Sequence, residues 1–253
     1  MRNTNSTYRE ISLIVELQRA IKYLRLGLSE LQNITPANDF YDPVFLHLSN
    51  GIERMLKVML CLSFKEQNNR LPNTNEIWKL KEGHDLMLLK KKVEKITIPP
   101  SARWCEGDYE TIVSDDSIDL VCLILAKFAQ KSRYFNLDAI LGYDQDFDSQ
   151  REWERLETFL AKKAFGESEY YKLLAHPKSL NAIYKTINKE LIVLIERFVR
   201  ALCRQFVFGN FSKESNKFLI VISDFYLIED EQLGHTVYSE FPIYEQISRK
   251  KQR

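Results

Sequence analysis

The sequence predicts a mainly α-helical protein, an antiparallel helical bundle with a small β-hairpin near its C-terminus. Apolar residues recur at alternating steps of three and four over several long stretches, which is the spacing of one face of a helix. The 253 residues include only 8 Gly and 7 Pro, too few for a turn-rich all-β chain. One late segment, residues 217–228, instead carries the β-branched and aromatic residues that are typical of a strand.

The first two helices are predicted to form an antiparallel pair. A capping box formed by Thr7 and Glu10 marks the start of the first helix. Gly27 lies within this helix and costs about 1 kcal/mol of helix propensity relative to Ala, so we expect close packing there. Asp42 as N-cap and Pro43 at the first helical position mark the second helix. The apolar stripes are Ile14, Leu17, Ile21, Leu24, Leu28 and Leu31 in the first helix, and Phe45, Leu48, Ile52, Met55, Met59 and Leu62 in the second.

The middle of the chain continues in helices around one loop. Residues 73–83 are expected to form a short helix, and His84-Asp85 to start the next one. Residues 97–116, with two adjacent prolines and several acids, are expected to form a surface loop. From Ser117 the run IDLVCLILAKFAQ is apolar on nearly all sides, which predicts a buried central helix.

Two more helices complete the predicted bundle. A capping box formed by Ser149 and Glu152 predicts the start of one helix. The longest apolar helix is expected to follow His176-Pro177 and to end near Gly209.

The hairpin is predicted to follow the bundle. Residues 217–228 and 235–241 are expected to form its two strands, joined by a polar turn. We therefore divide the chain into a helical bundle, residues 1–210, and an extension, residues 211–253, in which the hairpin and a basic tail pack on the bundle.

The composition excludes several classes of protein. The 36 basic and 35 acidic side chains nearly balance, so the chain as a whole carries no strong field for nucleic acid. Its four cysteines form no C-x-x-C pair, and we expect neither a metal nor a cofactor. The N-terminal residues lack the pattern of a signal peptide, and no apolar run approaches the roughly 20 residues of a membrane span. We therefore expect a cytoplasmic protein without membrane contact.

Two of the four histidines have neighbours that suggest chemistry. His47 lies seven residues before Arg54, so the two share a helix face and could hold and cleave an RNA phosphodiester, although an ordinary surface pair is favoured. His84 precedes Asp85 at a helix start, where Asp caps backbone N–H groups. A structural role is favoured for His84 because no nucleophile lies near it in the sequence, but it is kept as a candidate catalytic residue.

The segment RYFNLD, residues 133–138, ends the buried helix with an arginine, two aromatic residues and an aspartate. Arg133 could bind a phosphate bidentately while Tyr134 stacks on a base. In the alternative interpretation, Arg133 and Asp138 pair to lock the helix end and the aromatic rings lie in the core. Arg133 and Asp138 are the leading candidate catalytic residues.

A basic cluster occupies the polar face of the helix that follows His84. Such a cluster is usually a solvated face, but it could also follow an RNA backbone. Together with Arg133 and Tyr134 it forms the candidate nucleic-acid-binding set. The cluster consists of Lys90, Lys91, Lys92 and Lys95.

Three segments follow one another along the chain, LHLSNGIERMLKVMLCL, KEGHDLMLL and LAKFAQKSRYFNLDAIL. Their order resembles HEPN-like helical domains of prokaryotic defence and toxin–antitoxin modules, and the resemblance covers about residues 10–140. It implies a dimer, and in active members a metal-independent RNase with an R-x(4–6)-H motif. This chain has Asp138 where the histidine would stand after Arg133. An aspartate with a reference pKa near 3.9 is a poor general acid at neutral pH.

Three functions follow from these observations, and the first is favoured. The chain is expected to be a non-catalytic HEPN-like homodimer that binds RNA or a protein partner encoded nearby, in microbial defence. The alternatives are an active RNase that uses Arg133 and Asp138, with His47 or His84 brought near by folding, and a structural partner-binding protein without affinity for nucleic acid.

Overall fold

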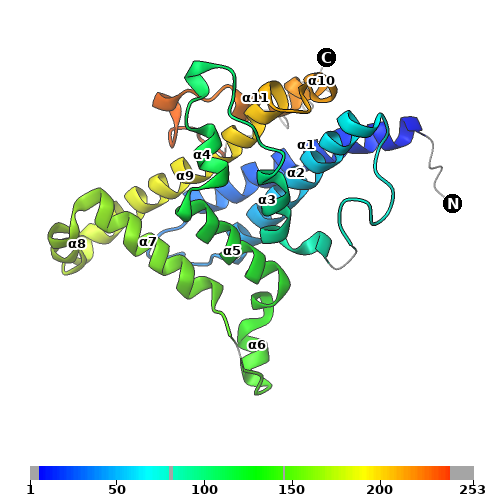
Figure 1. The fold of residues 1–253 in the computed structure, drawn as a ribbon. Helices are drawn as coiled ribbons and strands as arrows, with labels where there is room; N and C mark the ends of the chain where they lie inside the picture. Colours follow the sequence, from blue (N-terminus) through cyan, green and yellow to red (C-terminus); the bar gives the residue numbers. More distant parts are fainter. Residues whose placement is uncertain (1–5, 80–81, 145, 240–253) are drawn as a thin grey trace, which may run out of the picture.

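The chain folds into helices arranged around three long ones (Figure 1). The computed structural model describes residues 6–79, 82–144 and 146–239. The α-helices are α1 (Ser6–Gln32), α2 (Asp42–Asn68), α3 (Leu86–Glu94), α4 (Asp108–Val113), α5 (Asp116–Gln130), α6 (Phe135–Ile140), α7 (Ser149–Phe165), α8 (Glu167–Leu174), α9 (Leu180–Phe208), α10 (Ser212–Ser215) and α11 (Leu219–Tyr226). The short 3₁₀ helices are η1 (Glu82–His84), η2 (Arg103–Cys105), η3 (Ser132–Tyr134), η4 (Pro177–Ser179), η5 (Asn216–Phe218) and η6 (Asp230–Gln232).

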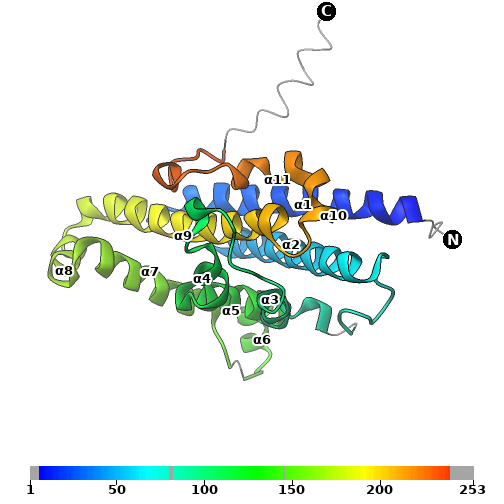
Figure 2. The ribbon, with the colours of Figure 1, turned by 45° about the horizontal axis from the view of Figure 1, so that its top comes forward.

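The long helices α1, α2 and α9 form the middle of the molecule. Helices α10 and α11 lie on one side of them, and α3, α4, α5 and α7 lie on the other (Figure 2). Helix α11 packs on α1 and α9, while α5 packs on α2, α7 and α9. The predicted helical bundle is therefore confirmed, and α5 is its buried central helix, as its apolar sequence predicted.

Two glycines let α1 and α2 pack closely as an antiparallel pair. A Cβ added at Gly27 would lie 2.7 Å from Cγ of Leu48, and a Cβ added at Gly51 would lie 2.7 Å from Cγ of Leu24. No side chain fits at that distance, so each glycine leaves the space that a leucine of the other helix occupies. The close packing predicted at Gly27 is confirmed, and Gly51 is its counterpart on α2.

A column of buried charged side chains on α9 fixes two distant segments. Glu196, Arg200 and Arg204 follow one another at four-residue steps and are at most 5% exposed. Arg204 pairs with Asp108 of α4 at 3.1 Å, and Arg200 pairs with Asp230 at 2.7 Å. Glu196 accepts hydrogen bonds at 2.5 Å from the Tyr238 hydroxyl and from the Gly234 backbone N–H. Helix α9 thereby holds both α4 and the segment after α11.

The surface loop predicted for residues 97–116 is wrong in part, because this region contains η2 and α4. Cys105 and Ile112 are fully buried. Asp108, one of the acids that suggested a solvated loop, is 3% exposed and forms the ion pair with Arg204. The partner that buries this acid lies almost a hundred residues away, which a local pattern does not reveal.

The predicted C-terminal hairpin is not formed in the described residues. The first predicted strand, residues 217–228, is wrong: it contains η5 and α11. Phe218, Ile222 and Phe225 recur at steps of four and three and are buried, so this face packs against α1 and α9 as a helix does. Residues 235–239 contain no strand. Residues 240–241 of the second predicted strand, and the basic tail, lie outside the described residues.

In the region before α3, the structure confirms the predicted start of α3 but not the short helix predicted ahead of it. Asp85 caps α3 as predicted, since its Oδ1 accepts a hydrogen bond at 3.0 Å from the backbone N–H of Leu88. The short helix predicted at residues 73–83 is wrong within the described residues, because residues 73–79 contain a turn and a bend but no helix, and the 3₁₀ helix η1 follows.

A half-buried carboxyl group connects the start of α2 to α7. The Tyr41 hydroxyl donates a hydrogen bond to Oε1 of Glu157 at 2.8 Å, and Nε1 of Trp153 donates to the same oxygen at 3.1 Å. Burial raises the pKa of Glu157 to about 7, an effect that these two hydrogen bonds only partly oppose. The native chain therefore keeps a proton on Glu157 at pH values where the unfolded chain has lost it.

Glu157→Gln is expected to remove one component of the pH dependence of stability. Because the pKa of Glu157 is raised from 4.5 to about 7, protonated Glu157 stabilises the folded state. This stabilisation is fully present below pH 4.5 and is lost as the pH rises toward 7. This loss amounts to as much as about 3 kcal/mol of the free energy of unfolding. Urea denaturation across this pH range measures it. The control Glu231→Gln changes an exposed carboxyl group of η6 and should keep the slope; an unchanged slope in Glu157→Gln would contradict the assignment.

Candidate functional site

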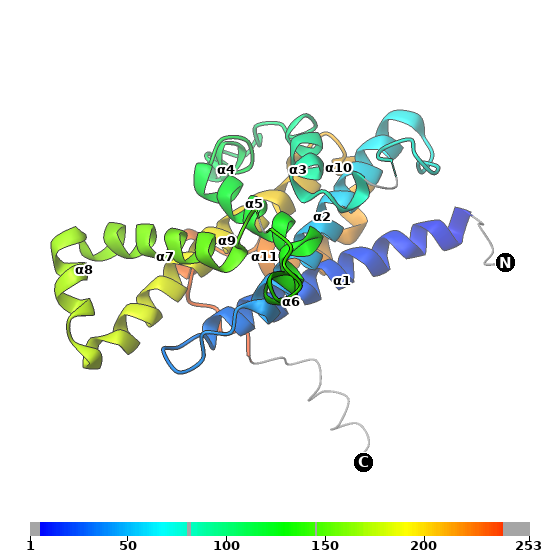
Figure 3. The same cartoon turned by 90° about the horizontal axis from the view of Figure 1, so that it is seen from below.

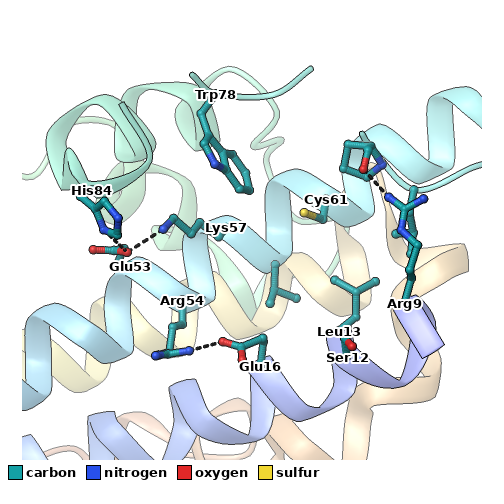
Figure 4. A pocket seen from close by; sticks show the side chains of 13 residues that line it. Arg9, Ser12, Leu13, Glu16, Glu53, Arg54, Lys57, Cys61, Trp78 and His84 are labelled. Atoms are coloured by element: carbon teal, nitrogen blue, oxygen red, sulfur yellow. Dashed lines mark hydrogen bonds and ion pairs between the residues drawn. The ribbon is translucent and has the colours of Figure 1, made fainter. Parts of the chain in front are cut away.

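A cavity of about 440 Å³ lies between α1 and α2. The two helices separate from their glycine contact toward the N-terminal end of α1 and the C-terminal end of α2 (Figure 3). The segment that follows α2 closes the cavity with Leu71, Pro72 and Trp78 (Figure 4). Its volume falls in the range of small-molecule sites in proteins.

One part of the cavity is apolar. Leu13 of α1, Val58 and Cys61 of α2, and the indole of Trp78 line it. Burial raises the pKa of the Cys61 thiol to about 11, so the thiol stays protonated at neutral pH. Because the thiolate is the nucleophilic form, Cys61 contributes apolar surface to the cavity rather than a reactive group.

The other part of the cavity is charged and internally paired. Lys57 donates a hydrogen bond to Oε1 of Glu53 at 2.6 Å, and Nδ1 of His84 lies 3.3 Å from the same oxygen. Lys57 also lies 5.7 Å from the centre of the Trp78 ring. Arg54 pairs with Glu16 across the two helices. Figure 4 shows these pairs along one side of the cavity.

The His84–Glu53 pair has the form of a histidine oriented by a carboxylate, but the cavity does not place a nucleophile beside it. Cys61 lies eight residues beyond Glu53 on α2, which is about 12 Å along the helix axis. Lys57 and Trp78 lie between His84 and Cys61 (Figure 4). The arrangement therefore suits binding better than nucleophilic catalysis.

The structure does not bring the leading candidate catalytic residues to this cavity. Arg133 and Tyr134 line a second cavity, of about 560 Å³, together with residues of α2 and α7. The Arg133 guanidinium lies 5.8 Å from the centre of the Phe128 ring. His84 lines the first cavity, and Asp138 lies on α6. The predicted grouping of Arg133 with His84 therefore does not form within one cavity.

The basic cluster divides into buried and exposed lysines. Lys90 is 1% exposed and pairs with Glu94 at 2.7 Å and with Asp119 of α5 at 2.6 Å. Lys92 donates a hydrogen bond to the backbone oxygen of Ile77 at 2.8 Å. The prediction that Lys90 lies on a solvated face is wrong, because α3 turns this side chain toward the acid on α5. Exposed members of the cluster are Lys91 and Lys95.

His47 and Arg54 share a helix face as predicted, but that face packs against Tyr23 of α1. The His47 ring stacks on the Tyr23 ring at 5.9 Å, and the Arg54 guanidinium lies 5.5 Å from the same ring centre. The Tyr23 ring therefore contacts both side chains, for which binding of a phosphodiester was the less favoured interpretation.

Helix α6 projects from the body of the molecule (Figure 1), and none of its residues is buried. Five large apolar side chains on α6 and on the residues next to it are each more than half exposed, and we call this group the α6 patch. The sequence predicted that the aromatic residues here pack in the core or stack on a base, but the exposed apolar residues that continue to Tyr143 were not predicted. The α6 patch consists of Tyr134, Leu137, Ile140, Leu141 and Tyr143.

The comparisons with known proteins give no relative from which a function can be transferred. No family model, no curated protein and no solved structure matches the chain. In the described part of the chain, no helix could cross a membrane, and no group of three or more histidine, cysteine or acidic side chains could hold a metal ion.

Proposed function

We propose that this chain is a non-catalytic, HEPN-like binding protein that acts in the cytoplasm as a homodimer, with the α6 patch as the surface that joins the two copies. The α6 patch is the observation that carries this proposal. Five large apolar side chains on α6 and on the residues that flank it have exposed fractions between 57% and 79%. Exposed apolar patches on a protein surface mark sites of protein interaction.

Protein interaction is favoured over RNA binding by the chemistry of the patch. RNA binding needs a basic surface that follows phosphates. The lysine cluster offers less positive charge than its sequence suggests, because Lys90 is buried between two carboxylates and Lys92 faces Ile77 and Glu82. The α6 patch, in contrast, offers mainly aliphatic and aromatic surface.

Self-association is favoured by the charges on the two sides of α6. The exposed cations Lys131 and Arg133 precede the helix, and the exposed acids Asp144 and Asp146 follow it. Two copies related by a twofold axis, with their α6 helices antiparallel, place the basic end of each against the acidic end of the other. Such a surface is self-complementary, which a twofold interface requires.

The separation of the candidate catalytic groups supports a non-catalytic role. Arg133 and His84 line different cavities, and Asp138 takes the place of the histidine that active HEPN-like RNases use. A carboxylate in that position is a weak proton donor at neutral pH. We therefore propose that the homodimer works by binding, in microbial defence, in concert with a protein encoded nearby.

Ile140→Glu is expected to convert the dimer to a monomer, because it places a charge at the centre of the proposed apolar contact. Light scattering at micromolar concentration should give twice the mass of the chain for the unmodified protein and the mass of one chain for the variant. Ile220→Glu is the matched control, since Ile220 is 90% exposed on α11; this variant should remain dimeric. A monomeric unmodified protein, or a dimer that survives Ile140→Glu, would refute the role of the α6 patch.

Purified protein is expected to leave single-stranded RNA intact in the presence of a metal chelator, as followed by gel electrophoresis of a labelled substrate. The active-RNase alternative requires the opposite result. Cleavage that is lost in Arg133→Ala or Asp138→Ala, but kept in the control Lys178→Ala, which changes an exposed lysine of η4, would overturn the non-catalytic proposal.

A further inference from the structure

The apolar part of the cavity between α1 and α2 contains an aromatic ring. The indole of Trp78 lines it (Figure 4), together with Leu13 of α1 and Val58 of α2. Aromatic rings gain from stacking on an indole as well as from the burial of their area. The cavity volume of about 440 Å³ accommodates a two-ring ligand.

Among the described residues that line the cavity, one cation forms no ion pair with a carboxylate of the lining. Three cations line it, Arg9, Arg54 and Lys57, against the two carboxylates of Glu16 and Glu53. Arg54 pairs with Glu16, and Lys57 pairs with Glu53.

Arg9 is the remaining cation, and a neutral group holds it in place. Its guanidinium donates a hydrogen bond to the backbone carbonyl oxygen of Pro72. The carboxylate of Glu76 is held by Arg70 at 2.6 Å, and that of Glu10 by Lys65 at 2.6 Å. Because the carbonyl group is neutral, the Arg9 guanidinium keeps its positive charge and its other N–H donors for an incoming carboxylate.

We propose that this cavity binds a small aromatic carboxylate, with the ring stacked on Trp78 and the carboxylate on Arg9. A monoanion balances the excess of one positive charge, and its ring covers the apolar walls. The site lies on α1, α2 and the segment after α2, so it does not depend on self-association through α6.

Fluorine NMR of protein labelled with 5-fluorotryptophan tests this site. The chain contains 3 Trp, and Trp104 and Trp153 lie outside the cavity, so they serve as internal controls. Titration with 2-naphthoate is expected to shift the Trp78 resonance saturably and to leave the other two in place. The neutral isostere 2-naphthamide is expected to bind about tenfold more weakly, because it lacks the charge-assisted hydrogen bonds to Arg9.

Variants separate the contribution of charge from that of shape. Arg9→Met is expected to bind 2-naphthoate and 2-naphthamide with equal affinity, while the control Lys22→Met, an exposed cation on α1, keeps the tenfold preference. Ser12→Trp retains Arg9 and fills the cavity, and is expected to abolish binding of both probes without lowering the thermal midpoint. Ile140→Glu is expected to bind as the unmodified chain does.

Four outcomes would overturn the proposal. These are an unmoved Trp78 resonance at saturating probe, parallel shifts of all three tryptophans, equal affinity for the two probes in the unmodified chain, and a preference that survives Arg9→Met.

Discussion

The close contact of α1 and α2 at Gly27 and Gly51 is the constraint on which the other features depend. Each glycine receives a leucine of the opposite helix, and a Cβ at either position would lie 2.7 Å from that leucine. The contact fixes where the two helices meet, and their separation beyond it opens the cavity that Trp78 closes. Helices α5, α9 and α11 then pack on the pair.

The charged column on α9 complements this apolar contact by fixing segments that are distant in sequence. A buried ion pair contributes little net stability compared with well-packed apolar groups, but the loss of one partner typically costs about 3–5 kcal/mol. Arg204 with Asp108, and Glu196 with Tyr238, therefore specify where α4 and the segment after α11 dock. Helix α6 projects from the body of the molecule (Figure 1), with Leu137 and Ile140 more than half exposed.

Helical periodicity was sufficient to predict the elements that pack through their own apolar stripes, namely α1, α2, α5 and α9. It failed where a distant partner decides the environment of a residue. The sequence around Asp108 predicted a loop, but the structure pairs Asp108 with the distant Arg204. The sequence around Lys90 predicted a basic face, but the structure pairs Lys90 with Asp119 of α5. For the candidate site, the sequence identified His84 but not Arg9 or Trp78, because no short spacing connects residues that meet only after α1, α2 and the following segment have packed.

A double-mutant cycle between Gly51→Ala and Leu24→Ala, measured by urea denaturation, tests the glycine contact most directly. The new Cβ at residue 51 would meet the Leu24 side chain at 2.7 Å and its backbone nitrogen at 2.9 Å. Gly51→Ala should therefore lower the free energy of unfolding by about 1–3 kcal/mol, although Ala favours a helix by about 1 kcal/mol. In the Leu24→Ala background, the decrease in the free energy of unfolding caused by Gly51→Ala should be smaller by about 1 kcal/mol or more. The reason is that the shorter side chain at residue 24 leaves space for the new Cβ. A gain of about 1 kcal/mol from Gly51→Ala in both backgrounds, the effect of helix propensity alone, would contradict the dependence of the fold on this contact.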